Sequence, residues 1–356
     1  MRKYIPLSVP TIGGNEWNYV KECLDTEWVS SAGKYVDLFE QKISEYTGSK
    51  YSIACVNGTS ALQVSLRLSG VEPGDEVLAP TITFIAPVNA IIYNNAIPVF
   101  FDSDEYYNIN IDKVIDFFEK ETFFKGGFTY NKRTKNKIAA IIPVHVWGNA
   151  SNIFEIQNFC QERNIKIIED ASESLGTFYK NKPFSKKHTG TIGDFGCISF
   201  NGNKIITCGG GGIILTNDEE KAEKAKYLST QAKSDPVYYI HDDVGYNFRL
   251  TNIQAAMGVA QLENIDKILK RKSLINDRYI NGLKNSKEYF VPKSPDYSKN
   301  NHWLNLIKFK NQNKDHLQHL VDALELNGIQ SRPVWHLNHL QKPYKSFQSY
   351  KIEVAY

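Results

Sequence analysis

The sequence predicts an α/β protein whose main part is a mostly parallel sheet, followed by a smaller α+β unit. Short apolar runs rich in β-branched residues alternate with helical stretches from about residue 51 to residue 216. Such alternation is typical of parallel strands joined by helical crossovers. The chain has 356 residues, of which 42% are hydrophobic, so it is long enough for a large domain and a smaller one.

The runs that alternate in the first part of the chain define the expected strands and helices. They are Tyr51–Val56, Ala61–Leu68, Glu76–Ala79, Ile85–Asn94, Ile97–Phe101, Ile138–Val144, Ile153–Arg163, Ile165–Glu169, Cys197–Phe200 and Gly212–Leu215. The segment Phe123–Lys137 is rich in Lys, Gly and Asn, which predicts a surface hairpin.

The pattern changes after Thr216. We expect a helix over Asp218–Tyr227, a polar and aromatic loop over Gln231–Leu250, and one long helix over Asn252–Arg271. Helix, strand (Leu304–Phe309), helix (His316–Leu326) and strand then follow. The sequence therefore predicts a large domain over residues 1–275 and a small domain over residues 276–356.

Composition narrows the class of protein. Lys and Arg number 42 against 39 Asp and Glu, and the net charge of +3 predicts no nucleic-acid surface. The five cysteines are odd in number and show no C-x-x-C spacing, which favours reduced thiols. The residues after Met1 form no apolar signal region, and the apolar run Ile138–Val144 is too short to span a bilayer. We expect a cytoplasmic protein with no membrane partner.

Lys204 and Asp170 are the two residues that most directly indicate a cofactor site. Lys204 follows an apolar strand and is followed by the glycine run Gly209–Gly212, where backbone passes close to a ligand without steric cost. Asp170 ends the apolar strand that begins near Lys166. A lysine that bonds an aldehyde and a carboxylate that faces a pyridine nitrogen are what pyridoxal phosphate (PLP) requires. The alternative without a cofactor is that Lys204 is a surface lysine and Asp170 an ordinary turn aspartate.

A third element is the helix expected to open at Asn57-Gly58-Thr59-Ser60, directly after a strand. The first N–H groups of a helix are free and favour an anion, although an ordinary Ser/Thr cap has the same sequence. Ser199 precedes the lysine and offers a second hydroxyl for phosphate, and Phe84 is expected to lie over a flat ring. Because strand ends converge on one edge of such a sheet, we expect these residues to meet.

The histidines predict no metal site. His316 and His319 share a helical face, and His336 and His339 have the spacing of a ligand pair, but no third ligand is placed to join them.

With these residues in place, the chain resembles the sugar-nucleotide aminotransferases of the DegT/DnrJ/EryC1/StrS family, within the fold-type-I PLP enzymes, from Pro6 onward. It is most similar to the branch that makes 4-amino-4,6-dideoxy sugars for bacillosamine and legionaminic acid. The resemblance rests on ordered motifs: Gly13–Glu16, Ser30–Lys34, Asn57–Leu62, Thr83–Ala86, Glu169–Gly176, Gly193–Gly196, Ser199–Lys204, Gly245–Asn252 and Ser331–Pro333. It implies a large domain with a seven-stranded type of sheet and a small C-terminal α+β domain.

The resemblance also implies roles. Lys204 would be the catalytic lysine that carries the cofactor, Asp170 would pair with the pyridine nitrogen, and Glu173 would lie near the ring hydroxyl. The further residues expected to contact PLP or its pyridoxamine form are Gly58, Thr59, Ser60, Phe84, Ser199 and Asn252. Those expected to contact the substrate are Ser31, Asn201, Arg332 and His339. Asn252 would reach across a homodimer interface to the partner's cofactor phosphate.

The implied reaction moves an amino group from L-glutamate to a keto sugar on a nucleoside diphosphate. The first expectation for the acceptor is a UDP-linked 2-acetamido-4-keto-6-deoxyhexose, whose product would enter bacterial glycan synthesis; the alternative is a 3-keto sugar or one linked to GDP or dTDP. A noncatalytic regulator that only binds PLP or a sugar nucleotide is a remote alternative, because Lys204 and Asp170 are both present. Relatives continue for a few dozen residues beyond a segment like Tyr350–Ala355, so the small domain is expected to be short.

Overall fold

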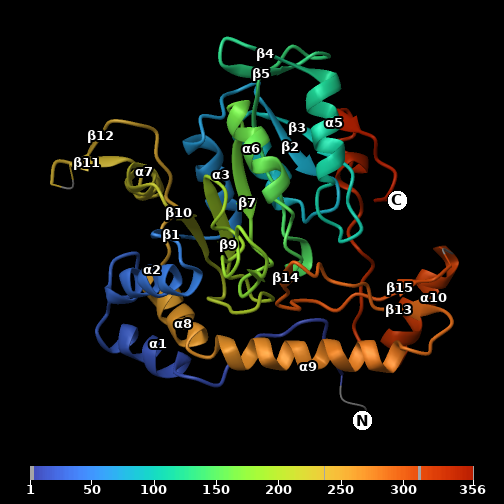
Figure 1. The fold of residues 1–356 in the computed structure, drawn as a ribbon. Helices are drawn as coiled ribbons and strands as arrows, with labels where there is room; N and C mark the ends of the chain where they lie inside the picture. The colour runs from blue at the N-terminus through green and yellow to red at the C-terminus, as the bar shows by residue number, and fades with distance from the viewer. Residues whose placement is uncertain (1–3, 236, 312–313, 356) are drawn as a thin grey trace.

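The computed structural model describes residues 4–235, 237–311 and 314–355. One sheet has the strand order β1-β10-β9-β7-β6-β2-β3-β16 (Figure 1). Its strands are β1 (Tyr51–Cys55), β2 (Glu76–Pro80), β3 (Ile97–Phe101), β6 (Ile138–Ile141), β7 (Lys166–Asp170), β9 (Phe195–Ser199), β10 (Gly212–Thr216) and β16 (Ser349–Tyr350). All pairs from β9 to β16 are parallel, and β10 is antiparallel to both neighbours. The predicted α/β class with a mostly parallel sheet is confirmed.

Helices cover both faces of the sheet because successive side chains of a strand point to opposite faces. Val77 and Ile168 belong to one apolar cluster, and their neighbours Leu78 and Ile167 belong to another. The first cluster includes side chains of α2 (Lys34–Thr47), α3 (Gly58–Leu68), α4 (Ala86–Tyr93), α7 (Glu219–Ser229) and α8 (Asn252–Leu262). The second includes side chains of α5 (Ile111–Glu121) and α6 (Phe154–Glu162).

The single helix expected over Asn252–Arg271 is instead two helices. Thr251 caps α8 in a reciprocal arrangement with Gln254, and α8 ends at Leu262. The next helix, α9 (Ile265–Leu283), runs across one end of the molecule (Figure 1). At the break, the Glu263 carboxylate accepts hydrogen bonds from Asn15 and Tyr19, both at 2.9 Å, and so joins α1 (Glu16–Asp25) to α8.

The predicted surface hairpin is confirmed. Strands β4 (Thr122–Lys125) and β5 (Phe128–Asn131) pair antiparallel around Gly126 and Gly127, whose φ angles are 59° and 83°. The hairpin lies at the end of the molecule opposite α9 (Figure 1). A second short hairpin pairs β11 (Lys233–Asp235) with β12 (Ile240–His241) inside the expected loop.

The C-terminal region contains less strand than expected. The strand predicted over Leu304–Phe309 is reduced to β15 (Lys308–Phe309), which pairs with β13 (Tyr289–Phe290), because Leu304 and Leu306 line a cavity instead. Two further pairings tie the region to the rest of the fold: β14 (Ser298–Lys299) with β8 (Phe178–Tyr179), and β16 with β3. The remaining elements are α10 (Lys314–Leu326) and the short 3-10 helices η1 (Val146–Gly148) and η2 (Asn338–Leu340).

The predicted division at residue 275 falls inside α9 and stays a prediction. None of the helices within the described residues has the length and apolar character needed to cross a bilayer. The five cysteines are buried and unpaired, as the sequence predicts.

Candidate active site

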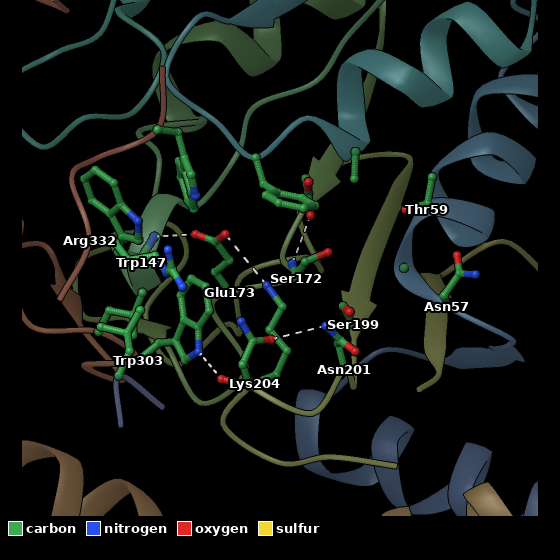
Figure 2. A pocket seen from close by; sticks show the side chains of 18 of the residues that line it. Asn57, Thr59, Trp147, Ser172, Glu173, Ser199, Asn201, Lys204, Trp303 and Arg332 are labelled. Atoms are coloured by element: carbon green, nitrogen blue, oxygen red, sulfur yellow. Dashed lines mark hydrogen bonds and ion pairs between the residues drawn. The ribbon is translucent and has the colours of Figure 1, made fainter. Parts of the chain in front are cut away.

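The carboxyl ends of β1, β7 and β9 open onto one cavity of about 500 Å³. Of the site residues expected from the sequence, it brings together Gly58, Thr59, Phe84, Asp170, Glu173, Ser199, Asn201, Lys204 and Arg332. Their convergence follows from topology, because β1 and β9 run in the same direction on either side of the antiparallel β10. Figure 2 shows several of these side chains from close by.

The N-terminus of α3 forms one wall of the cavity. Asn57 caps the helix, and its Oδ1 accepts a hydrogen bond from the Ser60 amide at 2.8 Å. The preceding amides, of Gly58 and Thr59, belong to a first turn that has no intrahelical acceptors and so favours an anion. A Cβ at Gly58 would lie 2.8 Å from the Ser199 Cβ, so only glycine allows this helix to approach β9 so closely.

At this wall, one serine that was expected to line the cavity does not, and another that was not expected does. The Ser60 side chain is 6% exposed and does not line the cavity, because its residue lies one position further into α3. Ser172 does line it, and its amide donates to Asp170 Oδ1 at 3.0 Å. The sequence analysis missed Ser172, although its place directly after a strand that ends in Asp170 is the same kind of signal.

Lys204 and Glu173 form the charged centre of the site. Lys204 Nζ lies 3.7 Å from Glu173 Oε1, and the two side chains are 13% and 5% exposed. Glu173 Oε2 accepts a hydrogen bond from the Trp147 amide at 2.8 Å (Figure 2). Burial raises the pKa of Glu173 to about 7, opposed by the Lys204 charge and assisted by the Asp170 charge. Glu173 is therefore poised to hold or release a proton near neutral pH.

A buried pair behind the site braces the strand that ends in Asp170. His145 Nδ1 accepts from the Ser151 amide at 3.0 Å, so its Nε2 carries the proton and donates to Glu169 Oε2 at 2.8 Å. Glu169 also accepts from the amides of Gly190, Ile192 and Gly193. Burial alone would raise the pKa of Glu169, but the hydrogen bonds from His145 and these amides lower it overall. The His145 amide in turn donates to the Asp170 carbonyl.

Aromatic rings form the opposite wall. Trp147 and Trp335 lie with ring centroids 5.2 Å apart, and Phe84 meets Trp335 edge-on at 6.3 Å. Phe84 is 55% exposed and lines the cavity, so one face is free for a flat group. The third indole, that of Trp303, lies over Lys204. Trp147 follows β6 at the same sheet edge and was predictable, whereas Trp303 and Trp335 come from the C-terminal region, where no strand end marks them.

Three expected site residues lie elsewhere. His339 is 9% exposed and its Nδ1 hydrogen-bonds the Thr81 hydroxyl at 2.6 Å. The Asn252 side chain is 2% exposed: its Oδ1 accepts from the Tyr35 amide and its Nδ2 donates to the Trp28 carbonyl, at 3.0 and 2.7 Å. Its backbone amide bonds the Ser30 carbonyl, so Asn252 holds the segment that contains Ser31. Ser31 does not line the cavity.

The residues at this site fit PLP. Free amides of α3 with the Thr59 and Ser199 hydroxyls suit a phosphate, Asp170 suits a protonated ring nitrogen, and Lys204 supplies the amine. The near-contact between Gly58 and Ser199 leaves the helix end open to a ligand and closed to a side chain.

The fold and this site define a PLP-dependent aminotransferase. The chain belongs to the DegT/DnrJ/EryC1/StrS aminotransferase family, whose model matches residues 10–355. Its general activity is that of a sugar-nucleotide aminotransferase.

Two curated relatives are similar over nearly the whole chain. EpsN of Bacillus subtilis strain 168, named provisionally as a pyridoxal phosphate-dependent aminotransferase, is 37% identical over 344 residues, which are 96% of this chain and 84% of EpsN. The GDP-perosamine synthase of Escherichia coli O157:H7 is 37% identical over 360 residues, 98% of this chain and 90% of the relative. A crystal structure of a family aminotransferase from Brucella abortus superposes with a TM-score of 0.85 at 29% identity, covering 96% and 87% of the two chains.

Proposed function

We propose that this protein transfers an amino group from L-glutamate to the keto carbon of a 4-keto-6-deoxy sugar linked to GDP. The observation that carries the transfer chemistry is Lys204 beside Glu173 in a cavity bounded by Asp170 and the N-terminus of α3. The cofactor, when bound, supplies the electron sink that stabilises negative charge at the carbon bearing nitrogen.

Residues of the chain transfer the proton, hold the reacting groups in place and exclude water. Lys204 Nζ moves a proton to and from the reacting carbon, since it is the amine at the centre of the cavity. Glu173, 3.7 Å away, keeps that amine in place and shares its proton. Asp170, whose Oδ1 is fixed by the Ser172 amide, keeps the ring nitrogen protonated. The Trp147, Trp335 and Phe84 rings exclude water on the side where a sugar enters.

Support for GDP comes from the name of the Escherichia coli relative, a GDP-perosamine synthase. This is the alternative of the sequence analysis, and it has better support than the UDP-linked 2-acetamido sugar that was placed first. Arg332 and Asn201, on the exposed side of the cavity, are the side chains through which we expect the acceptor to be read. His339 and Ser31 do not line this cavity, and their expected role in substrate binding stays a prediction.

The test is a panel of 4-keto-6-deoxy sugars linked to GDP, UDP and dTDP, each supplied with L-glutamate and PLP. Formation of 2-oxoglutarate and replacement of the carbonyl by an amine, followed by mass spectrometry, measure transfer. We expect the GDP sugar to give the highest kcat/KM. A preference for the UDP-linked 2-acetamido sugar would overturn the nucleotide assignment, and no transfer with any member would overturn the function.

We further propose that the protein is a homodimer. Large apolar side chains are exposed on α1, on the segment after it, and on the β11–β12 hairpin: Trp17 at 78%, Trp28 at 58% and Tyr238 at 79%. Large apolar side chains that are exposed to this extent are typical of association surfaces. The predicted reach of Asn252 to a partner's cofactor would require its hydrogen bonds to Trp28 and Tyr35 to break. Sedimentation equilibrium measures the assembly, and a monomer at all concentrations would contradict the proposal.

A further inference from the structure

The segment Asn301–Trp303 contacts both parts of the chain that supply the chemistry. Asn301 is 2% exposed, and its Nδ2 donates to the carbonyls of Glu173 and Leu175 at 2.8 and 2.9 Å. Its Oδ1 accepts from the Trp303 amide at 3.0 Å. One asparagine side chain therefore fixes this segment to the loop that carries Glu173.

A left-handed residue lies between Asn301 and Trp303. His302 has a φ angle of 51°, a conformation that L-residues other than glycine adopt rarely and at an energetic cost. It reverses the local backbone, and the buried side chains on both sides of it contact the catalytic region. The Trp303 carbonyl is held in turn by Lys272 of α9 at 3.0 Å.

Trp303 touches the Lys204 turn in two places. Its indole Nε1 donates to the Asn203 carbonyl at 2.6 Å, directly before the lysine, and Ser8 Oγ donates to the same carbonyl at 3.1 Å. Its ring lies against the lysine amine, with Lys204 Nζ 4.2 Å from the ring centroid. Figure 2 shows the indole beside Lys204 on the side away from Ser199.

We propose that Trp303, fixed by Asn301, is a positioning residue for Lys204: the indole N–H fixes the turn, and the ring face holds the charged amine beside Glu173. A desolvated ammonium over an indole face is among the stronger cation–π contacts. The interaction operates while the Lys204 amine is not bonded to the cofactor, which is when it must be close at hand to move protons. The inference rests on the role proposed above for Lys204.

Core packing alone would also bury this indole, since Trp303 is 3% exposed. Packing predicts that any apolar side chain of similar volume serves equally well. The contact with the amine predicts that an aromatic face is needed. Apart from Lys204, the charged residues that line this cavity are Glu173, Asp170 and Arg332. Replacing Trp303 leaves these three charges in place and removes only the contact of the ring with the amine.

The experiment compares Trp303→Phe, which keeps an aromatic face, with Trp303→Leu, which does not. The cofactor-free full chain is labelled with acetic anhydride at one pH for a series of times, and the Lys204 peptide is quantified by mass spectrometry against the exposed Lys21. Because the ring face no longer covers and holds the amine, we expect Lys204 to be labelled about tenfold faster in Trp303→Leu than in wild type. The increase should be smaller in Trp303→Phe, which keeps an aromatic face and loses only the N–H. Phe124→Leu, at an exposed aromatic side chain of β4, is the control.

A second measurement follows the half-reaction of the PLP-loaded enzyme with L-glutamate. Trp303→Leu should lower kcat about tenfold while KM stays nearly constant, which is the pattern expected when the indole acts on Lys204 and not on the bound donor. Equal labelling profiles for Leu and Phe would overturn the proposal. If Trp303→Leu does not fold, as judged by thermal melting, Trp303→Met makes the same comparison.

Different results would contradict the proposed function and the positioning role of Trp303. If Lys204→Ala keeps full activity, the proposed function is wrong, whatever the Trp303 variants do. If Lys204→Ala is inactive but Trp303→Leu has the labelling profile and kcat of the wild type, only the positioning role is wrong.

Discussion

Lys204 and Glu173 lie 3.7 Å apart, between Nζ and Oε1, although they come from different strand ends and both side chains are largely removed from solvent. The lysine lies on the turn after β9, and the glutamate follows β7. Each side chain has a second contact that restrains it, the Trp303 ring for the lysine and the Trp147 amide for the glutamate. The pair is thus held in the ligand-free protein in the arrangement that proton transfer needs.

Replacing Lys204 with alanine should abolish turnover and leave the fold intact. Its amine pairs with Glu173 inside a cavity, and a positioned acid or base contributes about 10²–10⁴-fold to rate. Steady-state kinetics with circular dichroism measures both properties. Lys21→Ala, at an exposed lysine paired with Asp25, is the control. Wild-type turnover in Lys204→Ala would remove the lysine from the mechanism.

Replacing Glu173 with glutamine should change how stability depends on pH. Folding raises the pKa of Glu173 from 4.5 to about 7, so the folded state binds its proton more tightly than the unfolded state. The wild-type free energy of unfolding should therefore fall relative to Glu173→Gln as the pH rises from about 4.5 to about 7, by up to about 3 kcal/mol.

Urea unfolding of the cofactor-free chain at several pH values gives this difference. Parallel pH profiles for wild type and Glu173→Gln would mean that Glu173 is ionised throughout and that its environment is wetter than the structure shows.

Replacing Glu169 with glutamine should destabilise the protein by about 2–4 kcal/mol above pH 5 or so. The new amide group would face N–H donors, either those of Ile192 and Gly193 or those of Gly190 and His145. Because folding lowers the pKa of Glu169, its contribution is present above the unfolded value and is lost as the pH falls through the folded one. The deficit should shrink in acid, and a pH-independent deficit would contradict a charged Glu169.

Replacing Gly58 with alanine should weaken PLP binding about 10–100-fold. The new methyl group would lie 2.8 Å from the Ser199 Cβ, and an overpacked contact of this kind costs about 1–3 kcal/mol. Fluorescence titration of the cofactor-free chain with PLP measures the affinity. Gly13→Ala, where a Cβ meets nothing within 4 Å, is the control. Unchanged affinity would show that the end of α3 does not bind the phosphate.

The sequence predicts the cofactor side of the site better than the substrate side. Thr59, Asp170, Ser199 and Lys204 follow strand ends, and the parallel topology alone brings such positions together. Trp303 and Trp335 enter the cavity from the C-terminal region through long-range pairings that have no local signal. Asn252 lies in a recognisable motif, but only the packed structure shows that its amide is used within its own chain.

The break between α8 and α9 was also not predicted, because it depends on contacts between residues that are far apart in the sequence. Periodicity continues across Glu263 and Asn264, so one helix is expected there, and the contacts of Glu263 with Asn15 and Tyr19 lie far away in the sequence. The bounds of short strands such as β16 could not be predicted either, because two residues are too few to show the alternation of apolar and polar side chains that marks a strand.

Strand β16 has a consequence for how the protein is made. Ser349 and Tyr350 pair with Phe100 and Phe101, so the edge of the main sheet beside β3 stays open until residue 350 has been synthesised. During translation, β3 presents an unpaired hydrogen-bonding edge while the roughly 250 residues between it and β16 are made. The late strand covers the edge at Phe100 and Phe101, two of the five residues of β3, so chaperones are expected to protect that stretch until β16 arrives.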